Sequence, residues 1–392
     1  MGSAGYARRF AVAVAILSVL ALGALPGSGH ALEGKSVKIG VLTMLTGPLK
    51  HNGQHQKEAL TVAINDLKKR GGIGGVPVEL IYFDTHMKNA QAIAGFRKLV
   101  KQDKVLAVIG PFLSNQVKAV SPIANELKTV MFSASSANPR LRGKLKPWGF
   151  RNSIFPPVAM KLSVSRWVTD NNVKSAAILY DNNITVMKVT GTRILPKLLK
   201  KLGVKVVDSI GYPNNNVDFS GEVTRLRSKN PDGIMMSGGY GDAGKIAREV
   251  RKQGLKSALY GGIDVSQAQY IKIGAGATEG TYSTSTLAFD NDSPEFKHFY
   301  TEYKKVSGDV DPHFTAAQAY ENLLILAKVI EASGVTNRPG DLASDRQKIR
   351  DGLAKVKGFR GPTGIINIGP HQDAEKKPYI LKVVNGHWKT LN

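Results

Sequence analysis

The sequence contains no cysteine and few aromatic residues, since Phe, Trp and Tyr together make up 7% of its 392 residues. Without cysteine, a disulfide framework, thiol catalysis, Cys-ligated zinc or iron–sulfur centres and a thiol-linked lipid anchor are all excluded. Acidic residues are also scarce, with 30 Asp and Glu against 54 Lys and Arg, which gives a formal net charge of +24. Hydrophobic residues still reach 42%, which is enough for a folded core. At about 150 residues per domain, the length predicts two domains or one large one.

Long apolar runs are absent except at the N-terminus. There, Arg8 and Arg9 precede the apolar run from Phe10 to Leu25, and Gly29-His30-Ala31 provides small residues for cleavage after Ala31. The run is too short for the hydrocarbon core of a bilayer, because about 16 residues at roughly 1.5 Å each reach only about 24 Å of about 30 Å. We therefore interpret residues 1–31 as a secretory signal peptide and expect export to the periplasm.

The positive charge alone is compatible with nucleic acid, an anionic membrane surface or acidic ligands as partners. The basic residues, however, are scattered along the chain and belong to no recognisable nucleic-acid module. An exported chain also rarely meets nucleic acid. We therefore expect no nucleic-acid partner and interpret most of the charge as solvated helix faces.

Short β-branched runs alternate with amphipathic windows along the chain. In the first half we expect strands over 37–42, 78–83, 105–109 and 129–133, and helices over 57–69, 89–101 and 115–128. The alternation begins again after residue 153, with strands over 176–180, 204–207, 233–237 and 259–263 and helices over 158–169, 188–202 and 245–252. Such a pattern predicts βαβ units and parallel sheets covered by helices. The fold class is therefore α/β, with two similar lobes.

The C-terminal third follows a different pattern. Ser293 as N-cap and Pro294 at the first helical position predict the start of a helix. A long helix is expected over 315–332 and a strand over 365–368, followed by a hairpin of strands 379–384 and 387–391. Asn385-Gly386 between the last two strands is the typical sequence of a two-residue type I′ turn.

Several short motifs follow one another in a specific order along the chain. They are Thr46-Gly47-Pro48, Gly71-Gly72-Ile73-Gly74-Gly75, Asp84, Ile109-Gly110-Pro111 leading into Ser114, Asn138-Pro139 and Gly238-Gly239-Tyr240. Together they resemble the type I periplasmic binding proteins of branched-chain amino-acid (Leu/Ile/Val) ABC transporters. The resemblance covers essentially the whole chain after residue 31.

This resemblance implies two Rossmann-like lobes that close on a small ligand and deliver it to a membrane ABC permease. It places three crossing segments near Arg151 to Pro156, Tyr282 to Phe289 and Phe359 to Gly364. The expected organisation is a signal peptide over 1–31, an N-terminal lobe of 35–152 plus 287–361, and a C-terminal lobe of 153–286 plus 362–392. We expect a monomeric binding protein that is not an enzyme and uses no cofactor or metal.

Two strand ends in the first half supply candidate ligand contacts. In open α/β sheets, ligands bind beyond the carboxyl ends of strands, where helix N-termini present free N–H groups. Phe112-Leu113-Ser114 is such a junction, and its amides and hydroxyl suit a carboxylate; alternatively, Ser114 is simply the N-cap of the next helix. Ser135, Ser136 and Ala137 follow the next strand and suit a polar ligand, or form an ordinary serine-rich loop.

In the second half, the resemblance points to Tyr240 as an aromatic that covers the ligand and to Asp264 as a partner for an α-ammonium group. Alternatively, Asp264 caps a helix that begins near Val265. Asn52, Ala137 and Thr185 depart from the residues that are usual in the family. The expected ligand is a hydrophobic or branched-chain amino acid, with an aromatic or aliphatic organic acid or an amide as the alternative.

A different class of function is offered by Gly239-Tyr240-Gly241-Asp242-Ala243-Gly244, which fits the G-x-G-x-x-G pattern of NAD-dependent oxidoreductases. This interpretation is the weaker alternative, because the motif lies deep in the second half, whereas such a motif normally lies in the first βα turn, and because an exported chain would not meet free NAD. His51 and His55 have the spacing of a helical metal pair. Because Gly53 lies between them and no Glu follows His51, we expect a loop at the cleft mouth instead.

Overall fold

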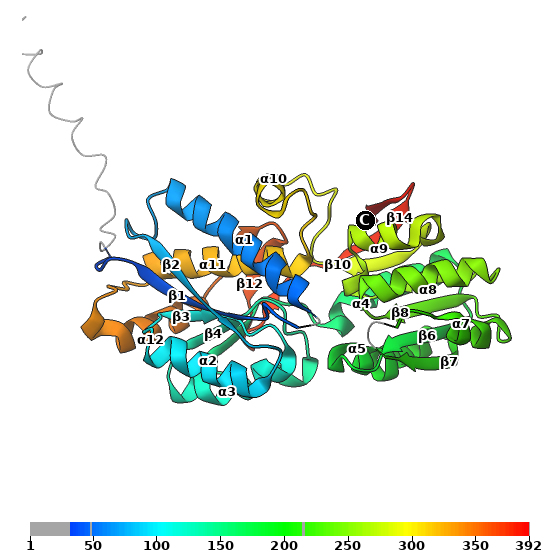
Figure 1. The fold of residues 1–392 in the computed structure, drawn as a ribbon, viewed down its shortest axis with the longest axis horizontal. Coiled ribbons are helices and arrows are strands. Elements are labelled where there is room, and N and C mark those ends of the chain that lie inside the picture. Colours follow the sequence, from blue (N-terminus) through cyan, green and yellow to red (C-terminus); the bar gives the residue numbers. More distant parts are fainter. Residues whose placement is uncertain (1–31, 48, 214–215, 392) are drawn as a thin grey trace, which may run out of the picture.

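The computed structural model describes residues 32–391 except Pro48, Asn214 and Asn215. The predicted signal peptide lies outside these residues. Figure 1 shows two lobes side by side, each built on a sheet with helices packed against it. Among the described residues, no helix has the length and hydropathy needed to cross a bilayer.

The first lobe contains five parallel strands in the order β2-β1-β3-β4-β5. Their bounds are β1 Val37–Thr43, β2 Val78–Asp84, β3 Ala107–Ile109, β4 Val130–Ser133 and β5 Gly149–Arg151. Helices α2 (Asn89–Lys101) and α3 (Ser114–Glu126) pack against each other, and α1 (Lys50–Lys69) packs against α10 (Pro294–Ser307) and α11 (Phe314–Ala332). Helix α12 (Leu342–Leu353) lies against α11. Segments far apart in sequence therefore form one core.

The second lobe contains seven strands in the order β15-β14-β10-β9-β8-β6-β7. Their bounds are β6 Ser175–Asp181, β7 Lys205–Tyr212, β8 Gly233–Ser237, β9 Ala258–Gly261, β10 Tyr282–Ser285, β14 Tyr379–Val384 and β15 His387–Leu391. The five parallel strands, read as β7-β6-β8-β9-β10, repeat the order of the first sheet. The two lobes therefore share one topology, as the repeated alternation in the sequence predicts.

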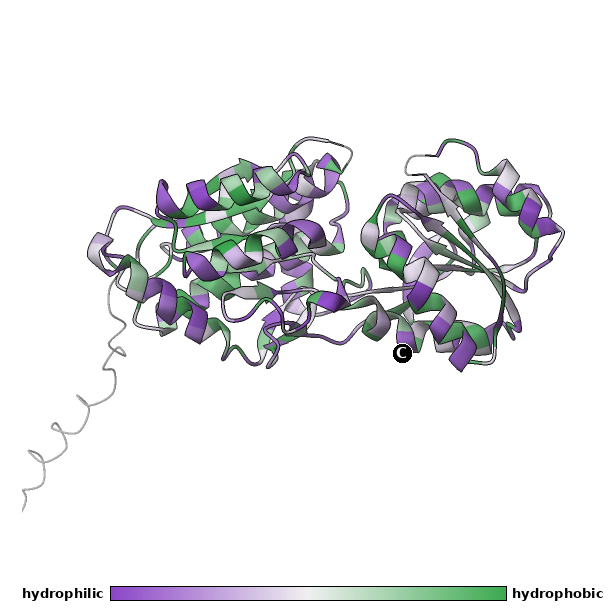
Figure 2. Ribbon diagram, turned by 90° about the horizontal axis from the view of Figure 1, so that it is seen from below, coloured by the Kyte–Doolittle hydropathy of each residue, from purple (hydrophilic) through white to green (hydrophobic). Residues whose placement is uncertain are grey.

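Helices cover both faces of the second sheet, and the core is divided accordingly. The helices are α4 Pro156–Asp170, α5 Thr185–Val189, α6 Leu195–Lys201, α7 Ser220–Arg227, α8 Tyr240–Lys252 and α9 Ala268–Gly274. Figure 2 shows the same two lobes turned by 90°, with narrow connecting segments between them.

Three short strands, β11 (Phe359–Gly361), β12 (Gly364–Ile368) and β13 (Ala374–Glu375), form a separate antiparallel sheet. Ile366, Ile368 and Ala374 belong to the core of the first lobe. We propose on this basis that the third connection between the lobes follows β13, whereas the resemblance places it near Phe359 to Gly364. We therefore propose that the last part of the N-terminal lobe ends at residue 376 instead of residue 361.

Two ion pairs are buried where the first and third connections meet. Arg151 is fully buried, and its Nε donates to Oδ1 of Asp373 at 2.7 Å. Nζ of Lys376 lies 2.8 Å from Oε2 of Glu321, and both side chains are fully buried. The amide of Asn152 donates to the same Glu321 oxygen at 3.0 Å. The two contacts of Glu321 join the connecting segments to α11, and the Arg151–Asp373 pair joins these segments to each other.

Several elements have the predicted bounds, including α2, β8 and both strands of the C-terminal hairpin. The hairpin turn has positive φ angles of 53° at Asn385 and 70° at Gly386, as a type I′ turn requires. The hydroxyl of Ser293 accepts a hydrogen bond from the amide of Phe296, which confirms the predicted N-cap.

Two helices differ from the prediction. Helix α1 begins at Lys50 rather than Lys57, so His51 and His55 lie on a helix and the predicted loop is wrong. Gly53 explains the difference, because a Cβ at this position would lie 1.7 Å from the carbonyl oxygen of Met44. The helix predicted over 188–202 is interrupted by a π turn from Thr190 to Ile194 between α5 and α6.

Candidate ligand site between the lobes

A cavity of about 120 Å³ lies where the two lobes meet. Residues that follow β1, β3 and β4 line it from the first lobe, and residues that follow β6, β8 and β9 line it from the second. Both sheets therefore contribute the carboxyl ends of their strands, next to the positions where the strand order reverses. This is where open α/β sheets bind ligands.

Ser114 lies on the first-lobe wall as the first residue of α3. The N-cap position belongs to Leu113, and no side chain caps this helix, so the alternative role of Ser114 as N-cap is not observed. The Ser114 hydroxyl accepts a hydrogen bond from Oγ of Ser136 at 3.1 Å. Because the first amides of a helix have no intrahelical partner, this wall offers N–H groups and a hydroxyl to an anion.

The loop after β4 is held by its own serines and by the first connecting segment. Oγ of Ser133 donates to the carbonyl of Pro111 at 2.7 Å and accepts from the amide of Ser136 at 3.2 Å. The carbonyl of Ser136 accepts from Oγ of Ser153 at 2.5 Å. Ser135 and Ala137 line the cavity, whereas Ser136 is buried behind it. Ser136 therefore supports the wall and does not form its surface.

Asp264 faces the cavity from the second lobe, within the short turn Ile263–Val265 that follows β9. Its carboxylate has no hydrogen bond or ion pair with any other side chain in the part of the chain that the structure describes. Burial raises the pKa of Asp264 to about 6. The predicted capping alternative is wrong, because this turn begins after Gly262 and α9 begins only at Ala268.

The other predicted residues lie around this cavity in different ways. Asn52 on α1 lines it and is 9% exposed, and its Oδ1 has no hydrogen-bond partner. Tyr240, the first residue of α8, lies at the side of an adjoining cavity, where its ring contacts His51 across the lobes at 6.0 Å between centroids. Thr185 is exposed and lines a third cavity with Ser114, while Ile184 occupies the wall of the main one.

The structure thus brings seven of the ten predicted residues to one cavity: Asn52, Phe112, Leu113, Ser114, Ser135, Ala137 and Asp264. Ser136, Tyr240 and Thr185 are neighbours of this group. Their contact with a ligand stays a prediction.

The apolar part of the cavity wall was not predicted from the sequence. Met160 lies on α4, Met187 on α5 and Phe314 at the start of α11. No motif marks these residues, because their common location depends on how three distant helices pack. A helix N-terminus combined with an apolar residue is too frequent a pattern to have identified them.

Three histidines lie beside the cavity. The ring of His55 stacks on His313 at 6.2 Å, and its Nδ1 lies 2.6 Å from the hydroxyl of Tyr303. Burial is the main cause that lowers the pKa of His51, His55 and His313, which favours their neutral forms. No group of three candidate metal-ligating side chains occurs within the described ranges.

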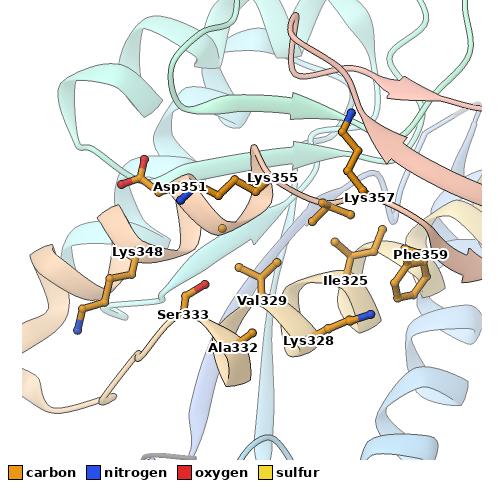
Figure 3. A pocket seen from close by; sticks show the side chains of 12 residues that line it. Ile325, Lys328, Val329, Ala332, Ser333, Lys348, Asp351, Lys355, Lys357 and Phe359 are labelled. Carbon is orange, nitrogen blue, oxygen red and sulfur yellow. The ribbon is translucent and has the colours of Figure 1, made fainter.

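A more spacious hollow of about 510 Å³ lies elsewhere, between α11, α12 and β11 (Figure 3). Four lysines surround its apolar floor: Lys328, Lys348, Lys355 and Lys357. It is lined by the first lobe alone and includes none of the predicted ligand contacts. The cavity between the lobes is therefore the better candidate for a site that closes on a ligand.

Comparison with known proteins extends over nearly the whole chain. The family described as "Periplasmic binding protein" matches residues 36–387. A leucine-, isoleucine-, valine-, threonine- and alanine-binding protein of Pseudomonas aeruginosa is 24% identical over 364 residues, which cover 92% of each chain.

Two solved structures have a similar fold. The leucine-binding protein of Thermotoga maritima aligns with a TM-score of 0.77 and 26% identity over 91% of this chain and 98% of that one. An ABC-transporter solute-binding protein of Rhodopseudomonas palustris, solved with 3,4-dihydroxybenzoic acid, aligns with a TM-score of 0.78 and 21% identity. Its alignment covers 91% of this chain and 95% of that one.

Proposed function

This chain belongs to the periplasmic binding protein family, and on that premise we propose that it is a receptor for a hydrophobic or branched-chain amino acid. The receptor closes its two lobes on the ligand and delivers it to an ABC permease. We place it in the periplasm, after removal of residues 1–31. The proposed role is binding and not catalysis.

The observation that carries this proposal is that the two walls of one cavity favour ligand groups of opposite charge. The first lobe presents the N-terminus of α3 and the hydroxyl of Ser114, which favour a carboxylate. The second lobe presents the unpaired carboxylate of Asp264. Asp264 is partly buried, and closure of the lobes would take its carboxylate further out of water. A carboxylate buried without a cationic partner is unfavourable, and an α-ammonium group supplies that partner.

The wall between these two polar ends is apolar. Met160, Met187 and Phe314 suit an aliphatic or aromatic side chain. The volume of about 120 Å³ is well below the roughly 300–1,000 Å³ of drug- and cofactor-sized pockets. This size supports a small solute. The adjoining cavity that Gly239 to Asp242 line holds about 160 Å³, which argues against a dinucleotide there.

An aromatic or aliphatic organic acid, or an amide, is the second candidate ligand. Asn52, Ala137 and Thr185 favour it, because they replace the residues that are usual in branched-chain amino-acid receptors. The solute-binding protein of R. palustris mentioned above was solved with an aromatic acid. Such a ligand leaves Asp264 without a counter-charge, which makes the amino acid the first choice.

A thermal-shift screen of residues 32–392 against amino acids, aromatic acids and amides, followed by calorimetry, tests the proposal. A ligand at 100 times its dissociation constant should stabilise the folded protein by about 2.7 kcal/mol. Stabilisation by a hydrophobic amino acid is the expected result. If only des-amino acids bind, the second candidate replaces the first, and if no compound in the screen binds, the receptor proposal fails.

A further inference from the structure

Arg151 lies directly behind one wall of the ligand cavity. It is the last residue of β5, is fully buried and does not line the cavity itself. Its Nη1 donates to the carbonyl of Asn138 at 2.8 Å and more weakly to the carbonyl of Ser136 at 3.4 Å. These two carbonyls flank Ala137, which lines the cavity. One guanidinium group therefore holds the loop after β4 from behind, on both sides of a wall residue.

The guanidinium group is itself fixed from two further directions. Its Nε donates to Oδ1 of Asp373 at 2.7 Å, and the main chains of the two residues are joined by a β-bridge. Its central carbon lies 4.6 Å from the ring centre of Phe155, the residue that precedes α4. Arg151 therefore cannot shift without moving one of these partners.

The loop that Arg151 holds reaches the proposed carboxylate site through Ser136. Oγ of Ser153 donates to the Ser136 carbonyl at 2.5 Å, and the Ser136 hydroxyl donates to Oγ of Ser114 at 3.1 Å. A serine hydroxyl has one proton to donate and can accept at its oxygen. Because the Ser114 oxygen accepts from behind the wall, its own proton stays available to a ligand in the cavity. The position of Ser136 therefore determines how the Ser114 hydroxyl is oriented.

Stability alone does not explain an ion pair at this place. A buried ion pair is often no more stabilising than apolar residues of similar size, since the cost of taking two charges out of water offsets their attraction. Nη2 of Arg151 and Oδ2 of Asp373 are also buried, and neither has a hydrogen-bond partner among the described residues. An apolar side chain could fill the same space, but only N–H groups can hold two carbonyl oxygens.

We propose that Arg151 is a positioning residue for ligand binding. Through the loop after β4 it fixes the Ser136 hydroxyl, which in turn orients Ser114 to donate its proton to the ligand carboxylate. Asp373 holds the guanidinium group in the orientation that this role needs. The inference rests on the proposed receptor function and adds to it a residue that does not touch the ligand.

A variant that removes both charges together, Arg151→Met with Asp373→Leu, tests this role without leaving a buried charge unpaired. In calorimetry on the chain of residues 32–392, it should bind leucine about tenfold more weakly than the wild type, because the Ser114 hydroxyl is no longer oriented. In the Ser114→Ala background, the same two substitutions should weaken leucine binding by less than about twofold, since the group through which Arg151 acts is already absent. A purely structural role would weaken binding by the same factor in both backgrounds.

Ser136→Ala tests the same contacts without disturbing a buried charge. It removes the hydroxyl that reaches Ser114 and keeps the carbonyl that Arg151 holds. It should weaken leucine binding several-fold in the wild type and leave it unchanged in the Ser114→Ala background.

The matched control for the loss of an arginine is Arg142→Met. The Arg142 guanidinium carbon lies 5.9 Å from the centre of the same Phe155 ring, but the residue is exposed. In the part of the chain that the structure describes, no hydrogen bond joins its side chain to the loop after β4. This variant should bind leucine as the wild type does.

The possible results separate the two proposals. If the substitutions leave affinity unchanged, or weaken it by the same factor with and without Ser114, Arg151 has no positioning role while the receptor function stands. If the Arg151→Met and Asp373→Leu variant does not fold, the two Ser136→Ala measurements decide in the same way. A wild type that does not bind leucine is tested with 4-hydroxybenzoate instead. If it binds neither, the receptor proposal fails for both ligand classes, and the positioning role fails with it.

Discussion

At the scale of single residues, the first prediction concerns Ser114. Because its hydroxyl lies at the N-terminus of α3 and lines the cavity, Ser114→Ala should remove one charge-assisted hydrogen bond to the ligand carboxylate. The loss of about 1.5–3 kcal/mol should weaken binding roughly 10- to 100-fold in calorimetry. Ser165→Ala, on the exposed surface of α4, is the control and should bind as the wild type does. An unchanged affinity of Ser114→Ala would place the carboxylate elsewhere.

The second prediction at this scale concerns Asp264. It distinguishes amino-acid ligands from carboxylic acids that lack an amino group. Asp264→Asn keeps the shape of the side chain but removes the counter-charge for an ammonium group that is buried on closure. Affinity for leucine should collapse, while affinity for 4-methylpentanoate, its des-amino counterpart, should hold or improve. Calorimetry of both ligands with both proteins measures this difference. If the substitution changes neither affinity, Asp264 has no charge-pairing role.

At the scale of secondary structure, the N-terminus of α11 combines a cap with a titratable group. His313 is the N-cap of α11 and accepts from the amide of Thr315 through its imidazole. Burial lowers its pKa well below the ordinary value, so the folded protein binds fewer protons here than the unfolded chain does. Stability therefore falls as the pH drops below about 6.5, where the unfolded histidine becomes protonated.

His313→Asn separates the cap from the charge, because asparagine is a good N-cap but does not titrate. We expect this variant to lose less of its unfolding free energy than the wild type between pH 7 and pH 5. Denaturant unfolding at several pH values measures how steeply the free energy of unfolding changes with pH. Equal slopes for the two proteins would assign the acid sensitivity to other groups, with His51 and His55 as the next candidates.

The elements themselves were largely predictable, because apolar periodicity reports which face of a helix or strand is buried. Ser114 and Ser135 could be placed at the cavity because a residue's position after a strand is already visible in the sequence. The start of α1 could not be predicted, since helix formation around Gly53 depends on its close approach to Met44. The same limit applies to Ile184, which lines the cavity in place of Thr185 because of the local path of α5. Contacts between distant segments set these details.

At the scale of the whole molecule, the site consists of two walls that belong to different sheets. A ligand that contacts both Ser114 and Asp264 stabilises the closed arrangement and shifts the population toward it. Small-angle scattering should therefore report a smaller radius of gyration at saturating ligand than for protein confirmed to be ligand-free. Ser114→Ala at the same ligand concentration should remain closer to the ligand-free value. An unchanged radius at saturation would contradict closure.

The three connections between the lobes also determine when the first lobe can be finished. The chain leaves the first sheet after β5, builds all five parallel strands of the second sheet, and only then returns with α10 and α11. The apolar face of α11 belongs to the same core as β1 and β3, so a growing chain that ends at β10 still has part of this core exposed. During synthesis, the core of the first lobe therefore stays incomplete until α11 has been made. A chain with this order of assembly cannot complete its first core until it is nearly full length.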